Sequence, residues 1–172
     1  MTLESRIPLA AGLSGRYSPA PFPSLVNRSV FPDSVRFSLQ QRVLVGACGI
    51  LLAVPLVVAA RLVPDPAGLG THQQLGLPPC TFQWLFGMRC PTCGMTTSWS
   101  HATRGQVRQA LSANVGGLLL AVMAMGAAPW CFVSAVRGRW LTRPPSDRIL
   151  AAVALGIAVV TLIDWSIRIA LG

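Results

Sequence analysis

Three long apolar stretches constrain this chain more than any other feature of its sequence. Residues 43–60 contain 18 residues without a charged side chain, residues 111–136 contain 26, and residues 149–163 contain 15. A helix that crosses a bilayer needs about 20 mostly apolar residues. The first two stretches meet that length directly. The sequence therefore predicts an all-α, polytopic membrane protein rather than a soluble domain.

The third stretch reaches membrane length only if its helix continues through two charged residues to residue 171. Asp164 and Arg168 are four residues apart, so on a helix the acid lies one turn before the base and the two can pair. A long Arg side chain near a helix end can also extend to the lipid headgroups. We therefore expect a neutralised pair and a third span over 149–171, and an intramembrane ionisable site is the less favoured alternative.

The charge balance points to a lipid bilayer as the partner. Only 11% of the residues are charged, compared with about 25% in a typical soluble protein. All 14 basic residues are arginine, and the net charge is +9. These arginines are scattered, and no basic run interleaves with aromatic residues, so we exclude a nucleic-acid partner.

The arginines also predict a topology. Five of them precede the first span, and four lie in the short loop between the second and third spans, at Arg137, Arg139, Arg143 and Arg148. Loops that carry excess Arg usually face the cytoplasm. We expect the N-terminus and this loop to be cytoplasmic, and the segment between the first two spans and the C-terminus to face outward.

The first 42 residues are rich in Pro, Ser and Arg and have no apolar core before Val43. A cleavable signal peptide would place such a core within about the first 30 residues. We therefore expect the first span to serve as an uncleaved anchor. Residues 1–42 are expected to form a poorly ordered tail, and residues 43–172 a membrane domain.

The chemistry of the chain is concentrated between the first two spans, in a Cys-rich segment over 80–105. This segment holds the run Cys90-Pro91-Thr92-Cys93 and, ten residues upstream of it, Cys80. Between them, residues 81–88 are aromatic and apolar but too short to span, so we expect an interfacial or re-entrant helix. Cys48 and Cys131 fall inside predicted spans, where a thiol usually only packs.

One interpretation of the three cysteines is a metal site. Structural zinc takes four tetrahedral ligands, and His101 would be the fourth. If a helix runs unbroken from the motif, however, His101 lies about 12 Å beyond Cys93, at 1.5 Å per residue. His72 is a substitute, but nothing in the sequence positions it. Zinc is therefore possible and not favoured by the spacing.

Two further interpretations remain open. Where a helix begins at Cys90, its thiolate is stabilised by the helix N-terminus, and Pro91 suits a first turn, so the pair can be a redox couple. A thioredoxin-type enzyme is excluded because no strand pattern exists, and haem attachment is excluded because Gly94 stands where a histidine is required. Alternatively, two cysteines form a structural disulfide in an oxidising compartment.

A polar helix is predicted over about 95–104. Four residues recur along it at spacings of four, four and three, which places them on one side: Cys93, Thr97, His101 and Arg104. We expect this side to face water, with Met95 and Trp99 toward lipid. A polar groove for an anion, a proton or a partner is the alternative.

The segment from Cys80 to Asn114 resembles a bacterial family of small membrane proteins known as domain of unknown function 2752. The resemblance is carried by Cys80, Gly87, Cys90, Pro91, Cys93, Gly94, Thr96, His101, Gly105 and Asn114. The chain departs from the family pattern at Thr97, where Arg is usual, and at Val115, where Pro is usual. The family has no established activity, so the resemblance implies an architecture and a bacterial inner-membrane location, and no reaction.

The function predicted from the sequence is a structural or interaction role in the membrane, with Cys80, Cys90 and Cys93 forming a disulfide or metal site. The small size indicates a membrane-protein partner or a homo-oligomer, although no residue identifies one. The alternative is a membrane thiol–disulfide oxidoreductase, with Cys90 as nucleophile and Cys93 as resolving thiol. We lean toward a protein that is not an enzyme.

Overall fold

A computed structural model describes residues 36–171, so residues 1–35 of the poorly ordered tail predicted over 1–42 lie outside the described part, whereas residues 39–42 belong to a helix. The described chain is helical and contains no strand, which confirms the all-α prediction. In chain order its helices are α1 (Leu39–Arg61), the 3-10 helix η1 (Thr71–Leu75), α2 (Thr81–Phe86), α3 (Met95–Ala102), α4 (Val107–Ala113), α5 (Val115–Arg137) and α6 (Asp147–Leu171).

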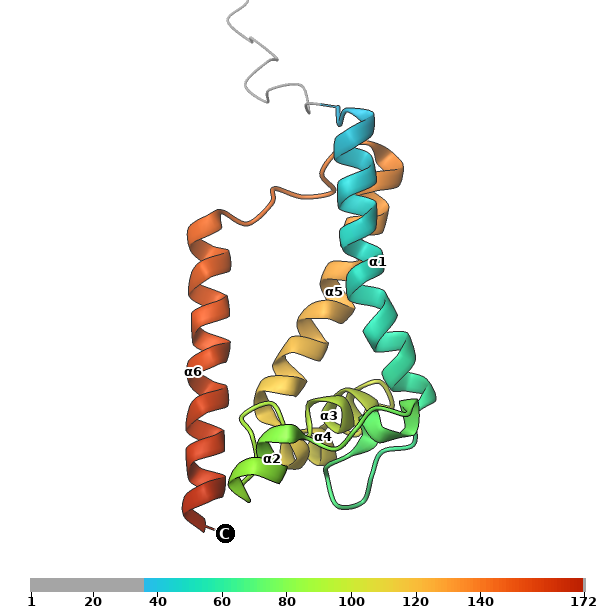
Figure 1. Ribbon diagram of the computed structural model, residues 1–172. Coiled ribbons are helices and arrows are strands. Elements are labelled where there is room, and N and C mark those ends of the chain that lie inside the picture. Colours follow the sequence, from blue (N-terminus) through green and yellow to red (C-terminus); the bar gives the residue numbers. More distant parts are fainter. Residues whose placement is uncertain (1–35, 172) are drawn as a thin grey trace, which may run out of the picture. The chain divides into compact units, whose positions relative to one another are not determined.

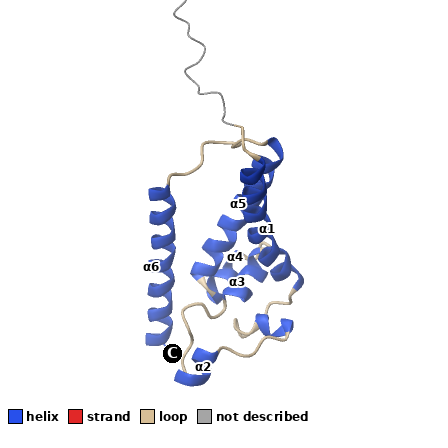
Figure 2. Cartoon of the chain, turned by 45° about the horizontal axis from the view of Figure 1, so that its top comes forward, coloured by secondary structure: helices blue, strands red, loops and turns tan. Residues whose placement is uncertain are grey.

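Three of these helices, α1, α5 and α6, are long and apolar enough to cross a membrane, as predicted (Figure 1). The protein is therefore a multi-pass membrane protein. The short helices α3 and α4 pack at the end of the α1–α5 pair that lies away from the α5–α6 loop (Figures 1 and 2).

Two span boundaries differ from the prediction because polar side chains cap the helices. The helix α1 begins four residues before the predicted first span, since Ser38 accepts from the Gln41 N–H and the Gln41 side chain accepts in return. The predicted second span divides at Asn114, whose extended backbone separates α4 from α5. The Asn114 side chain accepts from the Gly117 N–H at 2.7 Å and so caps α5.

The helices α1 and α5 cross closely because small residues line their contact. A Cβ atom added at Gly49 would lie 3.2 Å from the Cys131 Cβ and 3.3 Å from the Ala128 carbonyl oxygen. Membrane helices associate through such small residues, since lipid supplies no hydrophobic drive between them. Cys131 is buried at this crossing, as expected for a packing residue, whereas Cys48 is exposed.

Three arginines join the helices by donating to carbonyl oxygens at a helix C-terminus. Arg42 of α1 donates to Ala135 and Val136 at the end of α5, at 2.9 and 2.8 Å. Arg104, after α3, donates to Leu62 at 2.6 Å and Ala60 at 3.2 Å, at the end of α1. Arg168 of α6 donates to Leu111 and Ser112 at the end of α4. Each guanidinium therefore satisfies carbonyls that have no partner within their own helix.

The helix α6 contains no buried residue and is attached near its C-terminal end. The predicted pair is present there, with the Arg168 Nε 2.9 Å from the Asp164 carboxylate. The Trp165 indole N–H donates to the Arg89 carbonyl at 2.6 Å. One turn before Asp164, Thr161 lies against Gly116 of α5, where an added Cβ would overlap the Thr161 hydroxyl oxygen.

Substitution of Gly116 by Val tests the contact between α5 and α6. The new Cβ would lie only 2.9 Å from the Thr161 Cβ, so one of the two helices must shift. We expect a loss of about 1–3 kcal/mol in the free energy of unfolding, as for other overpacked sites. Unfolding by denaturing detergent measures it. The matched control is Gly126→Val on the same helix, where nothing lies within 4 Å; equal losses would contradict the contact.

Substitution of Arg104 by Gln tests the cap on α1. It leaves the Ala60 carbonyl without the guanidinium and the Leu62 carbonyl with only the Ser100 hydroxyl, and we expect a loss of about 1–3 kcal/mol in the free energy of unfolding. The control is Arg108→Gln, because Arg108 is exposed and its guanidinium makes no hydrogen bond or ion pair within residues 36–171. Thermal unfolding of both variants in detergent compares them, and equal midpoints would show that the cap contributes nothing.

Candidate thiol and metal site

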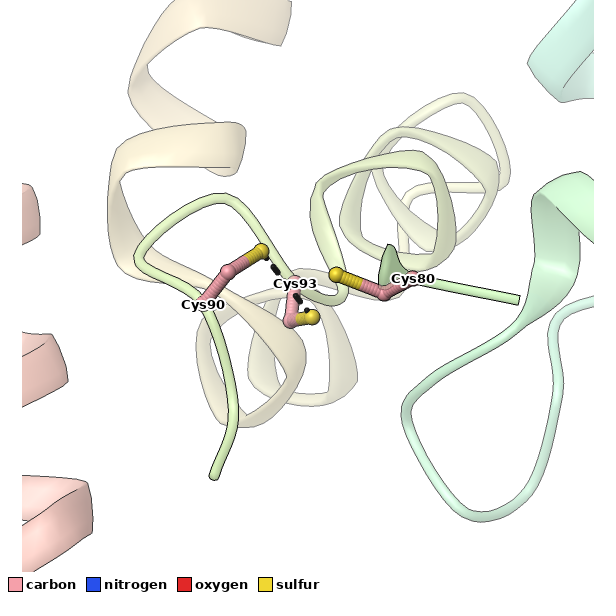
Figure 3. A group of neighbouring side chains, drawn as sticks. All are labelled: Cys80, Cys90 and Cys93. Carbon is pink, nitrogen blue, oxygen red and sulfur yellow. Dashed lines mark hydrogen bonds between the residues drawn. The ribbon is translucent and has the colours of Figure 1, made fainter. Parts of the chain in front are cut away.

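The three extramembrane cysteines converge at one point. Cys80 is the residue before α2, while Cys90 and Cys93 lie in the turn before α3. Their Sγ atoms all lie within 4.8 Å of one another, and the side chains point toward a common centre (Figure 3). All three are half-buried and reduced. The structure thus brings together thiols from two separate segments.

The turn at Cys90 and Cys93 is fixed by Gly94. The Cys93 N–H donates to the Cys90 carbonyl at 3.0 Å, and the two sulfurs are 3.1 Å apart. Gly94 then adopts a left-handed conformation with φ 82°. A Cβ at this position would lie 2.7 Å from the carbonyl oxygens of both Ala113 and Gly68. Only glycine fits here, which gives a physical reason for the residue that follows the second motif cysteine.

The turn is also held by Asn114. Its side-chain amide donates to the carbonyls of Pro91 and Cys93, each at 3.1 Å, while its oxygen caps α5. Asn114 is 3% exposed, so these bonds are made away from water. The N-terminus of a membrane span therefore positions both cysteines of the motif.

Hydrogen bonding makes the two motif thiols unequal. Partial burial by itself raises the pKa of Cys90, but hydrogen bonds with Thr92, Cys93 and Cys80 lower that pKa overall. Burial, followed by the hydrogen bond with Cys90, raises the pKa of Cys93 to about 12. The first proton lost by the pair therefore comes from Cys90.

The polar helix predicted from about residue 95 is present as α3, whereas the helix start at Cys90 that the redox interpretation required is absent. The run from Cys90 to Gly94 is a turn, and α3 begins only at Met95 because Gly94 is left-handed. Cys90 is thus outside the first turn of α3, and the helix N-terminus does not explain its reactivity. The hydroxyl of Thr92, 3.3 Å from the Cys90 sulfur, takes that role.

The expectation that one side of α3 faces water is also wrong. Thr97 is fully buried and shares a 2.7 Å hydrogen bond with Thr71 of η1. Trp99, expected toward lipid, packs against Leu56 and Ala121 of the core. The polar residues of α3 instead hold the ends of other helices, as when Ser100 donates to the Leu62 carbonyl at 2.8 Å.

The two histidines of the chain have different surroundings. His101, the ligand proposed from the sequence, has its Nδ1 2.6 Å from the Gln106 side-chain oxygen and does not lie among the three sulfurs. His72 instead lines a cavity of about 470 Å³ that the cysteines also line. Its neighbours around this cavity are Gln73, Cys80, Gln83, Cys90 and Cys93.

Thr71 is the residue that sequence reasoning missed. Its hydroxyl accepts from the Asp65 N–H at 3.0 Å and bonds Thr97, 26 positions along the chain. The only signal in the sequence is a polar residue between Gly70 and His72 in a turn-rich linker, which is weak. The remaining motif residues lie around the site: Thr96 lines the cavity, Gly87 ends α2, and Gly105 lies between α3 and α4.

Residues 80–128 match the family described as protein of unknown function (DUF2752). The family resemblance expected from the sequence is thereby confirmed. The DUF2752 region runs from Cys80 through α2, α3 and α4 into α5, so it contains all three clustered cysteines and Asn114. No curated protein and no solved structure matches the chain.

Alkylation of the reduced, metal-free protein tests the inequality of the two thiols. Because the pKa of Cys90 lies below its ordinary value of 9.0 and that of Cys93 near 12, Cys90 forms a thiolate at lower pH. We expect iodoacetamide to modify Cys90 first, with the Cys93 rate still rising above pH 10, as followed by peptide mass spectrometry. Thr92→Val should move the Cys90 profile to higher pH; identical profiles for both thiols would contradict the assignment.

Proposed function

We propose that the protein binds one transition-metal ion through Cys80, Cys90 and Cys93, and that this ion has a structural role. The observation that carries the proposal is the convergence of three sulfurs from two segments within 4.8 Å. A disulfide engages two cysteines and leaves the third without a role. Thiolates around a zinc ion, at about 2.3 Å from it, lie about 3.8 Å apart. The observed sulfur–sulfur distances, which run from 3.1 Å between Cys90 and Cys93 to at most 4.8 Å, include that value.

The chemistry of the donors supports zinc or another ion that prefers sulfur. Thiolate ligands select zinc and copper(I) over magnesium and calcium, and two cysteines separated by two residues are a common ligand pair. Three thiolates this close repel one another strongly unless a cation neutralises them, so without a cation Cys93 keeps its proton. A bound metal ion would replace the thiol protons and neutralise the three thiolates.

The structural role follows from the way α2 is attached. This helix has no buried residue and packs against no other helix of the described chain. Its side chains are largely exposed, with Trp84 at 80% and Phe86 at 60%. Trp suits the headgroup layer of a bilayer. An ion bound by Cys80 together with Cys90 and Cys93 would fasten this interfacial helix to the helices that hold the motif.

We place the protein in a bacterial inner membrane, with the cysteine cluster on the outer side. The Arg42 bonds to the end of α5 support a common side for the start of α1 and the α5–α6 loop. That loop is rich in Arg, which favours the cytoplasm. A lipid bilayer is the environment of the three spans, and a protein partner remains a prediction of the sequence.

A second candidate is a thiol–disulfide oxidoreductase, favoured by the 3.1 Å separation of the Cys90 and Cys93 sulfurs. The Cys90 thiolate would attack a substrate disulfide, form a mixed disulfide and release one substrate thiolate. The Cys93 thiolate would then attack the Cys90 sulfur and release the second. Two electrons pass from the pair to the substrate, and Cys90 and Cys93 end as a disulfide.

Elemental analysis of the purified protein, alongside alkylation mass spectrometry with and without reductant, separates the two functions. We expect about one metal ion per chain and three thiols shielded from alkylation until a chelator is added. Cys80→Ser, Cys90→Ser and Cys93→Ser should each lose the ion. The control Cys131→Ser, in a span, should keep it. A Cys90–Cys93 disulfide without metal would overturn the proposal and favour the redox candidate.

A further inference from the structure

Three thiolates leave one position open around a tetrahedral ion. We propose that His72 fills it, so that the site is a closed Cys₃His centre; this inference rests on the metal site proposed above. A closed tetrahedral set of four protein ligands is characteristic of structural zinc, whereas catalytic zinc keeps an open position. The fourth ligand thus decides between a structural ion and a reactive one.

The first observation is that His72 and the three cysteines line one cavity, of about 470 Å³. His72 is half-buried on its wall, and its ring makes no hydrogen bond within residues 36–171. It lies outside the group of sulfurs that are within 4.8 Å of one another, so ligation requires its side chain to turn inward. The cavity provides the space for that rotation.

The second observation is that the backbone next to His72 is fixed against the cysteine segment. Thr71, its neighbour, is fully buried and shares a 2.7 Å hydrogen bond with Thr97. Thr97 lies in the first turn of α3, four residues after Cys93. On either side, η1 is bounded by Gly70 and Gly76, both in the left-handed conformation. A buried hydrogen bond between two residues that are 26 positions apart in the sequence thus holds this short helix beside the cysteine motif.

The other side chains near the site fit less well. His101 bonds Gln106 and does not line the cavity. Asp65 accepts from the Ala67 N–H at 2.8 Å, and a carboxylate would add a fourth negative charge to three thiolates. Gln73 and Gln83 line the cavity, but amide oxygens are not typical zinc ligands. A neutral imidazole completes the tetrahedron without added charge.

Cobalt(II) titration of the reduced, metal-free protein in detergent tests the inference, because Co²⁺ reports its ligands by absorption. The wild-type protein should show sulfur-to-cobalt charge-transfer bands together with the d–d bands of a tetrahedral ion. His72→Gln should keep the charge-transfer bands of three Co–S bonds and shift the d–d bands. Its affinity for Zn²⁺ in competition should fall at least tenfold, since even outer-shell partners of metal ligands are worth about 10–100-fold.

The matched control is His101→Gln, which should titrate like the wild type. A second variant, His72→Cys, restores a metal ligand at this position and should bind Co²⁺ with an added sulfur-to-cobalt band. Binding by this variant would show that the weaker binding of His72→Gln comes from the missing ligand and not from misfolding. Identical d–d bands and affinities for His72→Gln and the wild type would overturn the inference and leave the three-cysteine site standing. A wild-type protein without sulfur-to-cobalt bands would overturn the proposed metal site itself.

Discussion

The arrangement of this protein depends on guanidinium groups that bind the carboxyl ends of helices. In a bilayer an unpaired carbonyl costs several kcal/mol, because no water is present to replace the missing bond. Arg42, Arg104 and Arg168 each donate to carbonyls of a helix other than their own. These hydrogen bonds therefore join one segment of the protein to the end of another helix, in addition to capping that helix. A planar guanidinium can donate to two carbonyls at once, which a lysine ammonium does less well, and the chain contains no lysine.

The two segments of the cysteine cluster differ in how they are attached to the rest of the protein. On one side, Asn114 joins the start of α5 to the turn that carries Cys90 and Cys93. On the other side, Cys80 leads into α2, which packs against no other described helix. At the proposed metal site, an ion would therefore join two ligands that are held by hydrogen bonds to a third on a helix with few contacts, so that metal binding and local folding would be coupled. The thiols therefore act at the boundary between a fixed scaffold and an interfacial helix.

The membrane spans could be predicted from the sequence because the length of an apolar stretch is enough to identify them. The pairing of Asp164 with Arg168 could be predicted because the two residues are one helical turn apart. The three cysteines could be recognised from their shared segment. The helix from about residue 95 could be predicted too, but the left-handed turn at Gly94 before it could not, since the carbonyls of Gly68 and Ala113 that require it are brought close only by the tertiary structure. The same holds for His72, because it is placed by the bond between Thr71 and Thr97, and neither residue type signals such a pairing.

The attachment of α6 has a consequence for how the protein responds to its lipid environment. At 25 residues this helix is about 37 Å long, while the hydrocarbon core of a bilayer is about 30 Å thick, so its charged residues near both ends can reach the headgroup layers. It buries no residue, and near its C-terminal end the Trp165 indole holds the carbonyl of Arg89, the residue before Cys90. Any movement of this end of α6 in the bilayer would therefore act first, through the Trp165 hydrogen bond, on the peptide beside Cys90.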